Sequence, residues 1–172
     1  RPECAGMGTT LVCLVFCGNR VSIGHIGDSR CYRLRGDKFE QLTRDHLLLQ
    51  EQIDGGQLIV EQARFSLNKN LVTRALGIEA IVPADIVEYR AEADDIYLLN
   101  SDGLTDMVEP TVVQSIIVKS RENLTAAAKE LVDTANQNGG RDNISVVLVR
   151  VPQAFLPSAA WAQRYLAKKR AG

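Results

Sequence analysis

The stretch LLNSDGLTD, residues 98–106, joins an apolar strand to two carboxylates across a glycine turn. The strand is apolar enough to be buried, and Gly103 allows the backbone to turn sharply after Asp102. Carboxylates at the end of a buried strand lose solvation energy unless positive charge meets them, so a hard cation is a reasonable partner for Asp102 and Asp106. The alternative is that Asp106 or Thr105 caps the helix that follows. The rest of the chain has to distinguish the two.

The composition is that of an ordinary globular domain. The 172 residues are 45% hydrophobic, and 20 basic against 21 acidic side chains give a formal net charge of -1. This length can bury a core, and the balanced charge gives no broad positive field for nucleic acid. No apolar run approaches the roughly 18 residues of a membrane helix, and the first residues lack a signal-peptide pattern. We therefore expect a cytoplasmic protein with neither a nucleic-acid nor a membrane partner.

Apolar runs and turn signals predict that the chain begins with antiparallel strands. Residues 11–16 and 21–26 read as a hairpin, and residues 30–35 and 39–42 continue it as a meander of about four strands. Both strands of the hairpin are apolar at nearly every position. This pattern indicates a sheet that is covered on both faces.

Helix signals begin after the meander. Thr43 or Asp45 is a candidate N-cap for a helix that ends at residues 55–56, where two glycines follow each other. The polar residues 57–70 read as a surface segment, either a flap or a plain connection. The other expected elements are a strand over 81–89, helices starting at Pro110 and over 124–136, a strand over 144–151 and a candidate short helix over 159–169.

One local pattern recurs three times along the chain, namely an apolar strand next to a glycine and an aspartate. It occurs at Asp28, at Asp102 and at Asp142. Strand ends in one sheet can converge, and several carboxylates at one point would suit Mg²⁺ or Mn²⁺, which take oxygen ligands. The alternative for each aspartate is that it closes its own turn by a bond from its side chain to the backbone.

The order and surroundings of these junctions resemble those of the metal-dependent type 2C (PPM) family of protein serine/threonine phosphatases, especially its compact bacterial members. The resemblance implies an α+β fold in which an antiparallel β-sandwich is flanked by α-helices in four layers, α-β-β-α. Six motifs in one order are far more specific than any single motif. They are GMGTT (6–10), GHIGDSR (24–30), LTRDH (42–46), VTRALG (72–77), SDGLTD (101–106) and GGRDN (139–143).

The resemblance also implies a set of metal ligands. Asp102 and Asp142 match aspartates that bind the second ion of a pair of Mn²⁺ or Mg²⁺ ions. Asp28 matches a carboxylate that holds a weaker third ion in some members, with Asp102 shared and Asp106 sometimes contributing. No catalytic side chain beyond these ligands is implied. The residues expected to support the site structurally are Gly27, Ser29, Gly103 and Asn143.

The implied reaction is hydrolysis of phosphoserine or phosphothreonine on proteins by a metal-activated water. A metal pair lowers the pKa of water and offsets charge on the phosphoryl oxygens. Phosphorylated proteins are the implied substrates, and a cognate serine/threonine kinase is a further implied partner. No cysteine lies in a phosphate-cradling loop, which argues against a thiol route. We expect His46 to be an exposed or capping residue and His25 to be packed in the core.

The chain departs from the family at its start, because the family's amino-terminal metal-binding segments have no counterpart before Gly6. Residues 1–152 therefore resemble the carboxy-terminal two thirds of a catalytic domain, and residues 153–172 form a tail. The chain is either a piece of a longer protein or a short form that has lost part of the site. The three retained aspartates favour the piece, for which we expect an uncovered apolar surface and an open strand edge.

Two other functions fit the sequence less well. The first is a non-catalytic module that binds phosphoproteins or a kinase. The second takes residues 102–106 as the nucleophile loop of a haloacid-dehalogenase-like phosphohydrolase. That loop normally lies early in a parallel α/β fold, whereas the first strands here are antiparallel.

Overall fold

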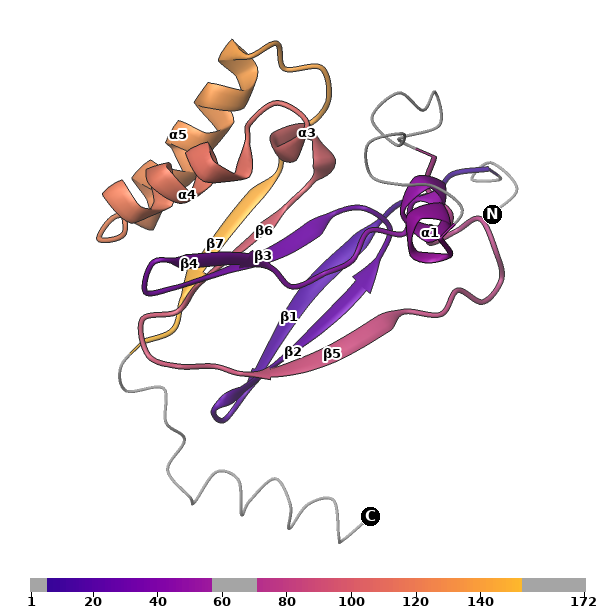
Figure 1. Cartoon of the computed structure of the whole chain (residues 1–172), viewed down its shortest axis with the longest axis horizontal. Helices are drawn as coiled ribbons and strands as arrows, with labels where there is room; N and C mark the ends of the chain where they lie inside the picture. Colours follow the sequence, from indigo (N-terminus) through magenta and orange to yellow (C-terminus); the bar gives the residue numbers. More distant parts are fainter. Residues whose placement is uncertain (1–5, 57–70, 153–172) are drawn as a thin grey trace, which may run out of the picture.

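The computed structural model of the chain describes residues 6–56 and 71–152 (Figure 1). It has the expected α+β fold, in which antiparallel sheets are flanked by helices. In chain order the elements are β1 (Leu11–Cys17), β2 (Arg20–Ile26), β3 (Arg30–Arg35), β4 (Lys38–Gln41), α1 (Leu48–Asp54), β5 (Asp85–Arg90), β6 (Ile96–Asn100), α3 (Asp102–Thr105), α4 (Pro110–Lys119), α5 (Leu124–Gln137) and β7 (Val146–Arg150).

The described strands form two antiparallel sheets. The first has the order β1-β2-β5 and the second the order β4-β3-β6-β7. The predicted hairpins β1-β2 and β3-β4 are confirmed, but the prediction of one continuous meander is wrong. Strand β2 pairs with β5 and β3 pairs with β6, so the chain crosses from one sheet to the other at residues 27–29. Gly27 permits this change of direction because its φ of +103° lies where a side chain would be strained.

A hydrophobic core fills the space between the two sheets. It contains Val21 and Ile23 of β2 together with Cys31 and Tyr97 of the second sheet, all of them fully buried. Phe16 meets Tyr97 edge-on, with their ring centroids 5.5 Å apart. The two sheets therefore pack face to face as a sandwich.

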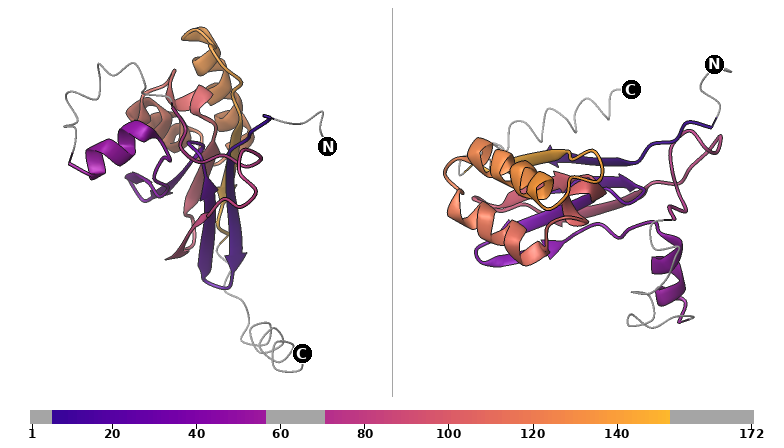
Figure 2. Two further views of the ribbon diagram at one scale, coloured as in Figure 1. Left: turned by 90° about the vertical axis from the view of Figure 1, so that its right-hand side faces the viewer. Right: turned by 90° about the horizontal axis from the view of Figure 1, so that it is seen from above.

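A second core lies between the other face of the second sheet and the helices α3, α4 and α5. Leu98 of β6 packs here against Leu104, Ile117 and Leu131 of the helices, and each of these four side chains is fully buried. Figures 1 and 2 show α4 and α5 side by side over this face. Because β6 contributes to both cores with alternate side chains, its apolar run is continuous, as the buried strand predicted from the sequence requires.

The outer face of the first sheet is different, because large apolar side chains on it are exposed. Val15 of β1 has 59% of its surface exposed and Ile86 of β5 has 75%. The expectation that the first hairpin is covered on both faces is therefore wrong for the part of the chain that the structure describes. The uncovered apolar surface that we expect of an incomplete sandwich is present on this sheet.

Several local expectations need adjustment. The predicted N-cap at Thr43 or Asp45 is wrong, because α1 begins after Leu47, although it does end at residues 55–56 as predicted. Asp106 ends α3 rather than starting the next helix, and Glu109 precedes α4. The proposed flap over 57–70 and the candidate helix over 159–169 lie outside the described residues. Within the described ranges, no helix has the length and apolar character needed to cross a membrane.

Candidate metal centre

The pairing of β6 with its two neighbours brings the three acidic junctions to one end of the second sheet. Arg30 at the start of β3 lies opposite Asn100 at the end of β6. Asp28, just before β3, and Asp102, just after β6, therefore lie at the same end of the sheet. Val146 at the start of β7 also lies opposite Asn100. The loop that carries Asp142 therefore reaches the same end of the sheet.

Three of the predicted carboxylates line one small cavity. Asp28, Asp102 and Asp106 surround it together with Asp45 and two other residues, and its volume is about 20 Å³. A space of this size admits a single water-sized guest. Asp142 does not line the cavity, but it is near enough for its charge to raise the pKa of Asp102.

The electrostatics of these carboxylates are unfavourable without a cation. Burial raises the pKa of Asp102 above its usual value, and the charges of Asp142 and Asp106 raise it further. Burial also raises the pKa of Asp28, and the next cause is the charge of Asp102. No ion pair joins any of these four aspartates to a described lysine, arginine or histidine. Asp102 is thus the carboxylate on which the repulsion within the cluster centres.

Contacts between two loops hold Asp102 and Asp142 near each other. The Ser101 hydroxyl donates to the Asn143 carbonyl oxygen over 2.9 Å and accepts from the Ser145 N–H over 3.0 Å. Gly103 permits this approach, since a Cβ there would lie 2.5 Å from the Asn143 carbonyl oxygen. Each aspartate also accepts the N–H of the residue that follows it. Ser101 was not singled out from the sequence as a supporting residue.

The turn that carries Asp28 is packed against the start of β1. A Cβ on Gly27 would lie only 2.3 Å from Cγ2 of Thr10. The hydroxyl groups of Ser29 and Thr10 are within 2.7 Å of each other and share a hydrogen bond. Ser29 therefore links the turn to β1.

Asp45 lines the cavity but already has a cationic partner. The Arg30 Nε atom donates to both carboxylate oxygens of Asp45 at 3.0 and 2.9 Å, and Nη2 donates to Oδ2 at 2.6 Å. Gln41 donates to Asp45 as well, over 3.1 Å. This neutralised side chain forms a wall of the cavity, a role that the N-cap interpretation of the sequence missed.

The structure also corrects the expectation for His46. This side chain is neither exposed nor a helix cap, because only 5% of its residue surface is accessible and its Nδ1 atom accepts a hydrogen bond from the Gly27 N–H over 3.1 Å. His25 is buried as predicted, and the two rings lie 4.8 Å apart. The only sequence signal for either histidine was its place within a motif, His25 in GHIGDSR and His46 in LTRDH.

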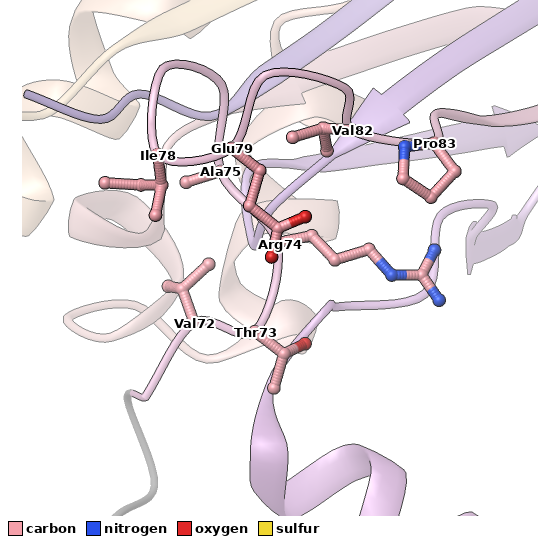
Figure 3. Close-up of a pocket in the computed structure, with 8 residues that line it drawn as sticks. All are labelled: Val72, Thr73, Arg74, Ala75, Ile78, Glu79, Val82 and Pro83. Atoms are coloured by element: carbon pink, nitrogen blue, oxygen red, sulfur yellow. The ribbon is translucent and has the colours of Figure 1, made fainter.

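A larger pocket of about 280 Å³ is lined by residues between 72 and 83. Figure 3 shows its walls of mixed polar and apolar side chains, with the Arg74 side chain extended so that its guanidinium lies on the side of Pro83. None of the four aspartates of the predicted metal site lines this pocket. Its lining residues are Val72, Thr73, Arg74, Ala75, Ile78, Glu79, Val82 and Pro83.

The carboxylates at the small cavity fit a hard divalent cation in the kind of donor they supply and in their repulsion, which the charge of Arg30 in the cavity wall offsets only in part. They do not make a complete site, since no three His, Cys, Asp or Glu side chains of the described segments converge closely enough to hold an ion by themselves. Mg²⁺ commonly keeps several waters and takes only one or two carboxylates from a protein. The described carboxylates are therefore candidates for part of a coordination shell.

Comparison with known proteins gives consistent matches. A family model described as Protein phosphatase 2C matches residues 1–144. Serine/threonine phosphatase stp of Listeria welshimeri is 42% identical over 144 residues, which make up 84% of this chain and 57% of that protein. The chain thus spans less than two thirds of the length of this curated relative.

Solved structures agree with the sequence matches. The Mycobacterium tuberculosis serine/threonine phosphatase PstP/Ppp superposes with a TM-score of 0.81 and 35% identity, over 88% of this chain and 63% of that one. The catalytic domain of the serine/threonine protein phosphatase PstP in complex with two manganese ions gives a TM-score of 0.76 and 36% identity, over 88% of this chain and 62% of that one.

Proposed function

Because this chain belongs to the protein phosphatase 2C family, we propose that it forms the carboxy-terminal part of a metal-dependent phosphatase domain. The proposed reaction is hydrolysis of phosphoserine and phosphothreonine on proteins by a metal-activated water. The domain part is assigned to residues 1–152 and a tail to residues 153–172. The proposal that the chain is part of a larger domain is supported by relatives that match most of this chain but under two thirds of their own length.

The observation that carries the proposal is the gathering of Asp28, Asp102, Asp106 and Asp142 at one end of the second sheet. We assign Asp102 and Asp142 to the second ion of a Mn²⁺ or Mg²⁺ pair, and Asp28 and Asp106 to a third ion that shares Asp102. Bound divalent ions would supply an activated water and offset the charge of the phosphoryl group. A relative that was solved with two manganese ions supports the choice of metal.

The chain's own residues prepare the centre for these ions. Burial and mutual repulsion disfavour the charged forms of Asp28 and Asp102, and the Arg30 charge offsets this only in part, so cation binding relieves an existing cost. Arg30 neutralises Asp45, which keeps that wall of the cavity from competing for the cation. Ser101 and Gly103 hold the two loops in contact. The domain's expected partners are phosphorylated proteins and a cognate serine/threonine kinase, acting in cytoplasmic bacterial signalling.

The test is Mn²⁺-dependent hydrolysis of p-nitrophenyl phosphate by this chain and by a chimera. The chimera joins the amino-terminal part of the Listeria welshimeri relative to residues 6–172 of this chain. We expect activity in the chimera, its loss in Asp102→Ala, and its retention in Asp37→Ala. Asp37 is a matched control because its side chain is 99% exposed in the β3-β4 turn. A folded chimera that shows no hydrolysis would contradict the proposal.

A second candidate function rests on the incomplete coordination shell. If the chain acts as it stands, it is a non-catalytic module that binds phosphoproteins or a kinase. The observation in favour is that no three metal-ligating side chains of the described residues lie close enough together to hold an ion. Binding of a phosphopeptide to the chain without Mn²⁺, combined with an inactive chimera, would favour this alternative.

A further inference from the structure

His46 makes two hydrogen bonds to the backbone of Gly27, the residue immediately before Asp28. The Gly27 N–H donates to His46 Nδ1 over 3.1 Å, and the His46 N–H donates to the Gly27 carbonyl oxygen over 2.8 Å. Both backbone polar atoms of Gly27 are therefore held by one residue. Glycine has more backbone freedom than any other residue, so these two bonds restrict the turn in addition to its packing against Thr10.

The hydrogen-bond partners also determine the tautomer of the ring. A backbone N–H can only donate, so Nδ1 of His46 carries no proton and the proton is on Nε2. Nε2 lies 3.0 Å from Oδ2 of Asp85 on β5, to which it donates. Arg74 donates to Oδ1 of the same carboxylate over 3.1 Å. The hydrogen bond from His46 is the main cause that lowers the pKa of Asp85, and the Arg74 charge lowers it as well, which keeps this carboxylate an ionised acceptor.

The backbone of His46 is fixed as firmly as its ring. Its carbonyl oxygen accepts the Thr73 N–H over 2.8 Å, and the next pair along the same ladder joins the Leu48 N–H to the Leu71 carbonyl oxygen over 3.0 Å. The ring is buried against His25. The two polar atoms of His46 that do not bond Gly27, the carbonyl oxygen and Nε2, are thus held by Thr73 and by Asp85 of β5.

We propose that His46 is a positioning residue that fixes the Asp28 carboxylate toward Asp102 by binding the backbone of Gly27. This role rests on the proposed function, in which Asp28 is a metal ligand. His46 itself touches neither the substrate nor the ion. Because His46 already holds the 27–29 turn in place, a cation does not have to order this turn when it binds. Residues that hydrogen-bond to metal ligands orient them in the same way in other proteins.

Two substitutions of His46 separate this role from simple packing. In His46→Asn, the amide oxygen takes the position of Nδ1 and still accepts the Gly27 N–H, but the contact with Asp85 is lost. In His46→Gln, the amide reaches the position of Nε2 and Asp85, but the acceptor for Gly27 is lost. Both variants carry a side-chain amide. Each replaces the buried ring with a smaller side chain and so leaves a space at the same place in the core.

Two readouts are measured on both variants and on the wild-type chain. Mn²⁺ affinity is measured by electron paramagnetic resonance of the free ion, with the chain and with the chimera. Hydrogen exchange of the Gly27 amide is measured by NMR without metal, and slow exchange of the Leu98 amide in β6 shows that each variant is folded. We expect His46→Gln to weaken Mn²⁺ binding about tenfold or more and to speed Gly27 exchange. His46→Asn should stay within about threefold of wild type in both.

The possible outcomes separate the two proposals. Equal Mn²⁺ affinity in both variants and the wild type overturns the role of His46 and leaves the metal centre standing. Equal weakening in both variants also overturns it, because loss of the ring alone would then explain the effect. Failure of the wild-type chimera to bind Mn²⁺ overturns the metal centre and the role of His46 with it.

Discussion

Replacing Gly103 with alanine tests whether the loops that carry Asp102 and Asp142 have to touch. A Cβ at Gly103 would lie 2.5 Å from the carbonyl oxygen of Asn143 and 3.1 Å from its carbonyl carbon. Ordinary contact begins at 3.4 Å, so the two backbones have to separate by about 0.9 Å, the difference between 3.4 and 2.5 Å. No side chain can move aside to absorb this change, because the nearest atoms are backbone.

Three hydrogen bonds resist that separation. They join the Ser101 hydroxyl to Asn143 and Ser145 and the Ser101 N–H to the Ser145 carbonyl oxygen at 3.1 Å. Overpacking of this kind costs about 1–3 kcal/mol, and the better helix propensity of alanine returns at most about 1 kcal/mol. We expect Gly103→Ala to lower the free energy of unfolding by about 1–2 kcal/mol. Mn²⁺ affinity should fall about tenfold as Asp142 moves away from Asp102.

The assays are urea unfolding at pH 7 in EDTA and a Mn²⁺ titration followed by electron paramagnetic resonance. Gly8→Ala is the matched control, because its Cβ would meet Cδ1 of Ile78 at 3.0 Å and that side chain is 62% exposed. Since the end of an exposed side chain can move, this control should lose less than about 0.5 kcal/mol. The reasoning is refuted if Gly103→Ala is as stable as Gly8→Ala and binds Mn²⁺ like the wild type.

Three further predictions concern charge, core and surface. Asp102→Asn should raise the free energy of unfolding of the metal-free chain by about 1 kcal/mol, and added Mn²⁺ should reverse the order of the two proteins in thermal melts. The pKa of Asp102 is raised above 3.8 in the folded wild type, so the folded chain takes up this proton at a higher pH than the unfolded chain does. The gain should therefore shrink as the pH falls toward 3.8, which urea melts between about pH 4 and 7 would show. Leu131→Ala should lower the free energy of unfolding in urea by about 2–5 kcal/mol, whereas Val112→Ala, at a position 44% exposed, should lower it by under about 1 kcal/mol. Similar losses in the two variants would contradict the assignment of the core. The exposed apolar face of the first sheet should make the chain self-associate in sedimentation velocity, and Val15→Lys combined with Ile86→Lys should reduce that association without lowering the unfolding midpoint. A large drop in that midpoint would show that the face is packed.

The strands and helices were largely predictable because their signals are local. The apolar run of β6 predicts a buried strand, and alternate residues do enter the two cores. Pro110 marks the start of α4, and the glycines after Asn138 mark the end of α5. The passage of the chain between sheets was not predictable, because the pairing of β2 with β5 joins segments about sixty residues apart and no turn signal specifies it.

The residues of the candidate site were likewise predictable from local sequence, but their arrangement in space was not. The order of the motifs was enough to name Asp28, Asp102 and Asp142 as expected ligands, and their assignment remains a prediction. Their convergence depends on the register of β3 and β7 against β6, which local patterns do not contain. Asp45 was misread for a related reason, since an aspartate before an apolar run usually caps a helix. Here its long-range partner Arg30 is stronger than the local preference.

The position of Asp28 on the passage between the two sheets has a mechanical consequence. The passage belongs to the first sheet through β2 and to the second through β3, whereas Asp102 belongs to the second sheet alone. An ion that binds both carboxylates would add a further link between the two sheets, at the end of the sandwich that carries the candidate site. Slow opening motions of the sandwich should then report metal occupancy, and amides of β2 and β6 should gain hydrogen-exchange protection together when Mn²⁺ is added.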